Sequence, residues 1–321
     1  MILQQLDSYF LLALSILSLV TAVPAPDPNG DREISVYIVP GNRTFPEGIA
    51  RQKNSPYFYV GSVTTGDIYR GSVYEKHLVH FITGSTHGLT NAVGMKIDCE
   101  DRLYVAGGAS GTLFAFDLHT KKLLHRFSNG FGLDANATLL NDLDIDEAGN
   151  VYITDSIRPT VFRVGASEVN RPTVDLALEK WTDLTGTMGP GGNGIVVTED
   201  QRHLLVANVY AGEIWRVVIS SRKVDKVDLG GTGIGGPDGL LIRDNILYSV
   251  NAFQEIGQFI RVIEMRPGYL SGTQVRNITS ELFERPSTVA FDGNDLLVVN
   301  FQYGVVIPVL PFTVVRVPIG G

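Results

Sequence analysis

One short pattern returns six times along the chain, and this repetition limits the possible folds more than any other feature of the sequence. Each copy has a polar turn, an anchor residue, a short apolar strand, a second polar turn and a second apolar strand. The anchors, spaced by 46, 48, 52, 45 and 49 residues, are Glu47, Val93, Asn141, Asn193, Asp238 and Ser287. This period is typical of propeller blades, so the repeats predict an all-β chain folded as a six-bladed β-propeller.

The turns and the first strand support this interpretation. Segments such as 146–150 (DEAGN) and 292–295 (DGND) supply Gly, Asn and Asp, which tolerate the bends between strands. The segment 33–39 (EISVYIV) precedes the first repeat, and we expect it to pair into the last blade and close the ring, which removes two open sheet edges. A two-sheet sandwich is the alternative, but the register of the repeats is kept along the whole chain.

The N-terminus has the pattern of a secretory signal. Residues 9–20 are an apolar run too short for a comfortable membrane span, and small residues follow it at cleavage positions after Ala22 or Ala25. We expect a signal peptide over 1–22, with an uncleaved anchor or a buried helix as alternatives. Residues 23–32 are polar and rich in Pro, which predicts a flexible lead-in, and 33–321 form the single propeller domain.

Three glycosylation sequons fit a secreted protein, and the cysteine count and the charge exclude two other features. Asn42, Asn136 and Asn277 each begin an Asn-x-Thr sequon. The chain has one Cys, so it forms no intrachain disulfide. A net charge of -8 argues against a nucleic-acid partner. We expect a monomer in the secretory lumen or outside the cell, with no stable membrane association once the signal is removed.

The anchors also predict a metal site. In a propeller the first strand of each blade lines the central channel, so residues at one register surround the axis. Four anchors carry carboxylate or amide oxygens, namely Glu47, Asn141, Asn193 and Asp238. Such donors suit Ca²⁺, or Mg²⁺ or Mn²⁺ with added waters, whereas zinc prefers His and Cys. The alternative is that these residues only make turns, which does not account for Glu47.

These repeats resemble a known group of propellers. The segments FPEGIA, LNDLDID, GNGIVV and PDGLLI are similar to regucalcin, gluconolactonase and diisopropylfluorophosphatase, and the likeness covers nearly all of the mature chain. The resemblance implies a Ca²⁺ held by one Glu, two Asn and one Asp, which match Glu47, Asn141, Asn193 and Asp238. The segments LYVAGGASGTLFAFD and LLVVNFQYG look most like a secreted NHL-type subgroup, in fungi and bacteria.

Several side chains are candidates for chemistry at this site. Asp238 is the expected nucleophile or base, since the matching Asp has that role in the resembling enzymes, and Glu47 is expected to be a ligand only. Asp142 follows Asn141 and could approach the ion or point back into the blade. His87, in the loop before the second repeat, is a second catalytic candidate, with a solvated loop histidine as its alternative.

The combined prediction is a secreted, divalent-metal-dependent hydrolase of a lactone or related ester, acting on a small molecule. The ion would polarise the carbonyl group. One alternative is a secondary-metabolite enzyme of the same fold that catalyses a cyclisation of the hetero-Diels-Alderase kind. Another is a non-catalytic binding propeller. We expect substrate specificity to reside in loops at 118–139 and 170–191.

Overall fold

The computed structural model describes residues 34–132, 136–231, 233–251 and 256–320. The expected signal peptide (1–22) and lead-in (23–32) lie outside these ranges. Ile34–Gly321 form one compact unit. The all-β class is confirmed, since the helical elements among the described residues are two short 3-10 turns, Gly84–His87 and Glu168–Asn170. None of the described helices has the length and apolar character needed to cross a membrane.

The strands form successive antiparallel sheets. In chain order, the first sheet holds β2 (Pro46–Arg51), β3 (Tyr57–Ser62), β4 (Ile68–Ser72) and β5 (Glu75–Ile82). The second sheet holds β6 (Met95–Ile97), β7 (Arg102–Ala106), β8 (Thr112–Asp117) and β9 (Leu123–Ser128). The third sheet holds β10 (Leu140–Ile145), β11 (Val151–Asp155), β12 (Thr160–Val164) and β14 (Glu179–Asp183), while β13 (Asp175–Ala177) pairs in parallel with β9. The segments expected as loops at 118–139 and 170–191 therefore contain β9, β13 and β14.

The later sheets repeat the same order. The fourth sheet holds β15 (Gly192–Val197), β16 (His203–Asn208), β17 (Glu213–Val218) and β18 (Val224–Lys226). The fifth sheet holds β19 (Pro237–Arg243), β20 (Ile246–Asn251), β21 (Ile260–Met265) and β22 (Gly272–Ile278). The last strands are β23 (Pro286–Asp292), β24 (Asp295–Asn300) and β25 (Phe312–Pro318). Strand β1 (Val36–Val39) pairs with β25 along its whole length and with β5 at Ile38 and His77, so an eight-stranded sheet joins both ends of the chain.

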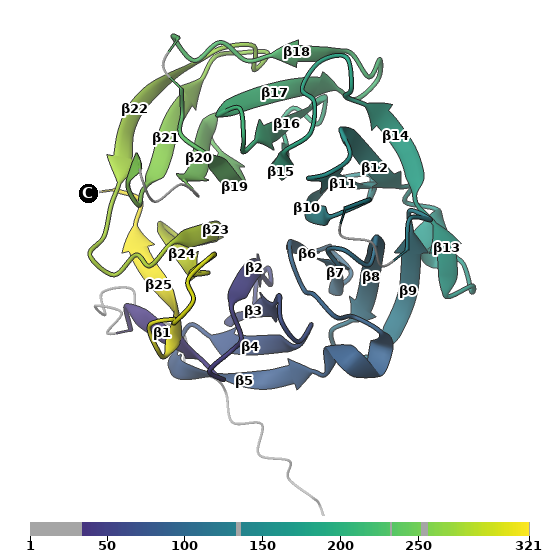
Figure 1. The fold of residues 1–321 in the computed structure, drawn as a ribbon, viewed down its shortest axis with the longest axis vertical. Coiled ribbons are helices and arrows are strands. Elements are labelled where there is room, and N and C mark those ends of the chain that lie inside the picture. The colour runs from purple at the N-terminus through teal and green to yellow at the C-terminus, as the bar shows by residue number, and fades with distance from the viewer. Residues whose placement is uncertain (1–33, 133–135, 232, 252–255, 321) are drawn as a thin grey trace, which may run out of the picture. The chain divides into compact units, whose positions relative to one another are not determined.

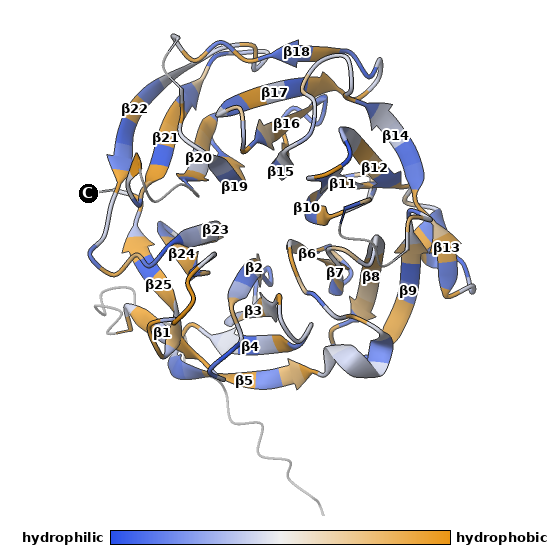
Figure 2. Ribbon diagram, in the orientation of Figure 1, coloured by the Kyte–Doolittle hydropathy of each residue, from blue (hydrophilic) through white to orange (hydrophobic). Residues whose placement is uncertain are grey.

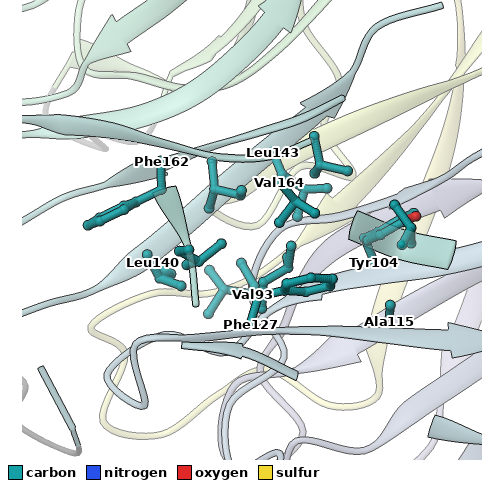
Figure 3. Close-up of a cluster of buried hydrophobic side chains, with 14 residues drawn as sticks. Val93, Tyr104, Ala115, Phe127, Leu140, Leu143, Phe162 and Val164 are labelled. Carbon is teal, nitrogen blue, oxygen red and sulfur yellow. The ribbon is translucent and has the colours of Figure 1, made fainter. Parts of the chain in front are cut away.

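The first strands of the sheets surround a common centre (Figure 1). Contacts run from β2 to β6, β10, β15, β19 and β23 in turn, and β23 contacts β2 again. Hydrophobic clusters fill the spaces between consecutive sheets, and Figure 3 shows one of them, which contains Tyr104 and Phe127 of the second sheet and Leu143 and Phe162 of the third. In Figure 2 the outer strands β14 and β22 are largely hydrophilic. The packing therefore stabilises the contacts between sheets and leaves the centre free for polar side chains.

Candidate metal centre

The four predicted ligands occupy equivalent places in four different sheets. Glu47, Asn141, Asn193 and Asp238 are each the second residue of the first strand of their sheet. Their exposed fractions are 6%, 9%, 8% and 8%, so all four polar side chains are withdrawn from bulk water. The structure thus places the equal register seen in the sequence at one level around the centre.

A repeated irregularity in strand pairing accounts for this placement. In the first sheet Pro46 pairs with Ser62 and Ile49 with Val60, so two residues of β2 stand opposite one residue of β3. The same shift occurs at the start of β10, β15, β19 and β23. Such a β-bulge bends the strand and changes the direction of a side chain. Each predicted ligand lies inside one of these bulges.

Three of the four predicted ligands carry a buried oxygen atom without a hydrogen-bond partner. These atoms are Glu47 Oε2, Asn141 Oδ1 and Asn193 Oδ1. Buried polar atoms are nearly always paired, because an unpaired one loses its hydration without compensation. Three unpaired oxygens at one register of the ring are what a hard cation with oxygen ligands would satisfy.

The amide groups are held so that their oxygen atoms remain available. Asn141 Nδ2 donates to Ser156 Oγ at 3.0 Å, and Ser156 Oγ donates to the carbonyl oxygen of Gly192 at 2.8 Å. The Asn193 side chain opposes the rise in the pKa of Asp238 that burial causes, so the amide and the carboxyl group lie near each other. Because the Asn141 nitrogen is engaged, the Asn141 oxygen faces away from that bond. The third and fourth sheets are thereby linked through the site.

The carboxyl groups of the site influence one another. Burial raises the pKa of Glu47 well above its usual range, and the charges of Asp238 and Asp142 raise it further. Burial also raises the pKa of Asp238, with a further rise from Asp142. Burial raises the pKa of Asp142 to about 6, against the opposing effect of Lys96. These shifts reflect several negative charges in a place with little water, which a divalent cation would stabilise.

Asp142 borders the site and is also bonded to the backbone. It lines a small cavity together with Glu47, Asn193 and Lys96. Its Oδ1 accepts the backbone N–H of Leu143 at 2.9 Å. The sequence left open whether Asp142 approaches the ion or points back into the blade. In the structure its carboxylate borders the cavity and is also bonded to the backbone N–H of the next residue in its own strand.

Glycine residues after the anchors let the inner strands approach one another. A β-carbon at Gly48 would overlap the carbonyl oxygen of Val93, and one at Gly194 would overlap the carbonyl oxygen of Asp238. A β-carbon at Gly94 would lie 2.5 Å from the carbonyl oxygen of Asn141. Each of these glycines thus meets the anchor of the next sheet, and a side chain there would push the ligands apart.

The remaining anchors have structural roles. Val93 packs in the hydrophobic cluster between the second and third sheets. Ser287 is fully buried, and its Oγ donates to the backbone carbonyl oxygen of Glu47 at 2.8 Å. Among the described residues no three His, Cys, Asp or Glu side chains are grouped as a metal site, so an ion here depends on the two asparagine oxygens as well.

His87 and the glycosylation sequons lie elsewhere. His87 ends a 3-10 turn, packs edge-to-face on Phe116 with 5.2 Å between ring centroids, and borders a different cavity from that of Glu47. The sequon residues Asn42, Asn136 and Asn277 are all exposed. Their side chains are therefore accessible, as a glycan acceptor requires.

The sequence interpretation missed Ser156 and Lys96, which support the site, whereas Asn300 was expected to cap the end of its strand. Ser156 and Lys96 carry no spacing signal, because their partners lie in other sheets. A set of polar residues at the ends of second strands was visible in segments such as YITD, LVAN, YSVN and LVVN. In the structure Asn208 Nδ2 donates to the carbonyl oxygens of Met188 and Pro190, and Asn300 Nδ2 to that of Leu282. These residues hold the segments that lead into the anchors.

The fold is shared with several solved structures. A gluconolactonase from Xanthomonas campestris has a TM-score of 0.63 at 15% identity, with 86% of each chain covered. A putative gluconolactonase has a TM-score of 0.62 at 14% identity, covering 88% of this chain and 92% of the other. Virginiamycin B lyase from Staphylococcus aureus has a TM-score of 0.62 at 12% identity, covering 88% and 97%. These likenesses establish a propeller-like fold.

A match to a family is found at the level of sequence. No curated protein matches the sequence of the chain. The family model of the SMP-30/gluconolactonase/LRE-like region matches residues 45–299, a range that runs from the first anchor repeat to the last and includes all four predicted ligands. The chain belongs to the SMP-30/gluconolactonase/LRE-like family.

Proposed function

We propose that the protein is a secreted, Ca²⁺-dependent hydrolase of a lactone or related ester. The observation that carries the proposal is the set of three unpaired buried oxygens on Glu47, Asn141 and Asn193, with Asp238 at the same register. Membership of a gluconolactonase-like family supports lactonase-type hydrolysis of a small molecule. A ring of oxygen donors that includes the carboxylate of Asp238 suits that chemistry.

The donor set fits Ca²⁺ best among common ions. Two carboxylates and two amides supply hard oxygen ligands, and Ca²⁺ accepts an irregular set of six to eight such atoms. Mg²⁺ and Mn²⁺ would need added waters, and zinc would lack its preferred nitrogen and sulfur ligands. Glu47, Asn141, Asn193 and Asp238 would hold the ion, which when bound would polarise the carbonyl group of the substrate.

The chain's own residues supply the nucleophile or base. The carboxylate of Asp238 would take a proton from a water that attacks the carbonyl carbon and displaces the ester oxygen. Alternatively, it would attack that carbon itself and displace the ester oxygen, and water would then hydrolyse the acyl–Asp238 bond to regenerate the carboxylate. Glu47 would stay a ligand. Asp142, whose Oδ1 is fixed by the Leu143 N–H, would contribute negative charge at the cavity wall. His87 remains the second candidate base, and we assign the role to Asp238 because Asp238 shares the register of the three unpaired oxygens, whereas His87 borders a cavity that none of the predicted ligands lines.

We also propose that the chain is a six-bladed propeller and that it is glycosylated in the secretory pathway. The pairing of β1 with β25 supports a six-bladed propeller whose last blade is completed by the N-terminal strand. The exposed sequons Asn42, Asn136 and Asn277 support glycosylation in the secretory pathway after removal of residues 1–22. We propose a monomer, since ring closure leaves the first and last sheets paired with each other.

Hydrolysis is favoured over cyclisation or simple binding by the charge of the site. A cyclisation in a dry pocket depends on positioning, which gives no reason for carboxylates whose burial is costly. A binding propeller likewise has no need of a carboxylate beside unpaired oxygens. Because one of the similar folds is a lyase, product masses must be measured, since hydrolysis adds the mass of one water and elimination does not.

The decisive experiment combines Asp238→Asn with a panel of lactones and esters, with and without chelator. We expect wild-type turnover to require the ion, and Asp238→Asn to lower kcat by at least about 100-fold at a Ca²⁺ concentration that fills the site of the variant. Asp244→Asn is the matched control, because the Asp244 side chain is 89% exposed in the turn of the same sheet. Unchanged turnover in Asp238→Asn would refute the assigned mechanism.

A further inference from the structure

The loop between β24 and β25 exposes a run of apolar side chains. In residues 303–310 the exposed fractions are 73% for Tyr303, 95% for Val306, 83% for Ile307, 58% for Val309 and 49% for Leu310. Several consecutive large apolar residues in water are unfavourable unless something covers them during function. The loop is therefore a candidate contact surface.

This loop is fixed at its base. Gln302 is 2% exposed, and its amide bridges the loop, donating to the carbonyl oxygen of Val309 at 2.8 Å and accepting the Val309 N–H at 2.8 Å. Phe301 N–H donates to the carbonyl oxygen of Arg285 at 3.1 Å, and Arg285 Nη1 donates to that of Tyr303 at 2.5 Å. The apolar tip is thus presented by a preorganised backbone, which lowers the entropic cost of binding.

Strand pairing places the loop beside the metal-site register. Asn300 is the last residue of β24 and pairs with Pro286. Ser287, which follows Pro286 in β23, donates from its Oγ to the carbonyl oxygen of Glu47. The base of the loop is bonded to Arg285, immediately before Pro286. The apolar residues therefore rise from the edge of the sheet at which the ligands lie.

Two neighbouring sheets carry apolar side chains at the equivalent place. A β-carbon at Gly191 would lie 2.7 Å from Tyr210 Cδ2, so the Tyr210 ring covers the segment that leads into Asn193. A β-carbon at Gly235 would lie 3.8 Å from Ile256 Cδ1, which puts Ile256 over the segment that leads into Asp238. Tyr210 is 66% exposed and Ile256 is 54% exposed. We define the apolar rim as Tyr210, Ile256, Tyr303, Val306, Ile307 and Val309.

The equivalent loop of the first sheet is polar. Ser62, the last residue of β3, pairs with Pro46 beside Glu47, and the exposed residues that follow are Thr64 and Thr65. Asn42, in the segment before β2, is exposed as well. The edge of the ring is therefore apolar over the fourth, fifth and sixth sheets and polar over the first. A flat lipid surface would contact the polar residues of the first sheet as well as the apolar ones. A small amphipathic molecule could instead place its apolar part on the apolar residues and its polar part on the polar ones.

We propose that the apolar rim binds the apolar part of the substrate, so that the preferred substrates are lactones or esters with an alkyl or aryl substituent rather than polyhydroxylated sugar lactones. This inference rests on the proposed hydrolysis for its reactive group. The ester group would lie at the register of Glu47 and Asp238, and the rim would cover the hydrocarbon portion. Burial of that portion removes apolar surface of both partners from water.

The test compares γ-lactones with ethyl and octyl side chains, and the matching non-hydrolysable lactams. The variant is Val306→Ser with Ile307→Ser, and the control is Val275→Ser, which is 49% exposed on the outer strand β22. We expect wild type to prefer the octyl lactone by at least about tenfold in kcat/KM. The rim variant is expected to lose most of that preference, chiefly through a higher KM for the octyl lactone, and the control is expected to keep it.

The lactams separate this inference from the proposed function. If wild type hydrolyses no lactone but binds the octyl lactam at least about tenfold more tightly than the ethyl lactam, and the rim variant does not, the rim assignment holds and hydrolysis fails. If ethyl and octyl compounds are turned over and bound equally by wild type, the rim assignment is overturned and hydrolysis stands. Loss of binding to phosphatidylcholine vesicles in the variant, with the octyl preference intact, would also overturn it in favour of a lipid surface.

Discussion

Ser287 Oγ donates a 2.8 Å hydrogen bond to the backbone carbonyl oxygen of Glu47, 240 positions earlier in the chain. The bond joins the anchor of the last repeat to the first predicted ligand, at the point where β23 and β2 meet. Arg51 and Asp292 form an ion pair of 3.1 Å between the same two strands. The geometry of Glu47 thus depends on closure of the ring, because its strand is held by the other end of the chain.

Replacing Ser287 by Ala should weaken both the fold and the site. The Glu47 carbonyl would lose a buried donor, which costs about 1 kcal/mol of unfolding free energy. Affinity for Ca²⁺ should fall as well, since Glu47 would be less firmly placed. Urea denaturation and calorimetry measure the two effects. Ser221→Ala, at an exposed turn, is the control, and equal stability of the two variants would contradict the role given to Ser287.

Gly194→Ala should separate two ligand-bearing strands. The added methyl group would overlap the carbonyl oxygen of Asp238, and relief of such a clash in a packed interior costs about 1 to 3 kcal/mol. At Gly186 a β-carbon meets nothing within 4 Å, so Gly186→Ala is the matched control. Thermal denaturation with and without Ca²⁺ provides the readout. A Gly194→Ala protein as stable as the control would argue against close contact between β15 and β19.

The metal-free protein should lose stability as the pH rises. Burial raises the pKa of Asp238 to about 8 in the folded state, whereas an unfolded Asp titrates near about 3.9. The folded protein therefore keeps a proton that the unfolded chain has released, and this contribution is complete below about pH 4 and disappears as the pH passes about 8. We expect Asp238→Asn to show a smaller loss, because burial still raises the pKa of Glu47 and Asp142, and we expect bound Ca²⁺ to suppress the loss. Melting temperatures from pH 5 to 9 in chelator check the difference between wild type and variant; parallel curves would contradict it.

The ligand register could be predicted from sequence because the repeats preserve it. Equal positions in repeated sheets meet at equal places around the centre, so Glu47, Asn141, Asn193 and Asp238 were accessible to spacing alone. The bulges that direct these side chains could not be predicted from the sequence, because a bulge adds one residue without a distinctive composition. Ser156 was missed for a related reason, since the bond that orients Asn141 depends on the close approach of two sheets.

The surroundings of the site were harder to predict. Residues 305–310 (VVIPVL) have the apolar pattern of a buried strand, yet most of them are exposed in a loop held by Gln302. Conversely, the segments 118–139 and 170–191, expected as specificity loops, contain strands β9, β13 and β14. Sequence patterns identify apolar runs, whereas their exposure depends on which neighbouring sheet is available to cover them.

Calorimetric titration of Ca²⁺ into chelator-treated protein tests the central claim most directly. We predict that wild type binds one Ca²⁺ per chain and that saturation at about 100 times Kd stabilises the fold by about 2.7 kcal/mol. Glu47→Gln, which keeps the size of the side chain and removes its charge, should bind far more weakly. Absence of Ca²⁺ binding by wild type at millimolar concentration, or equal binding by Glu47→Gln, would contradict the account.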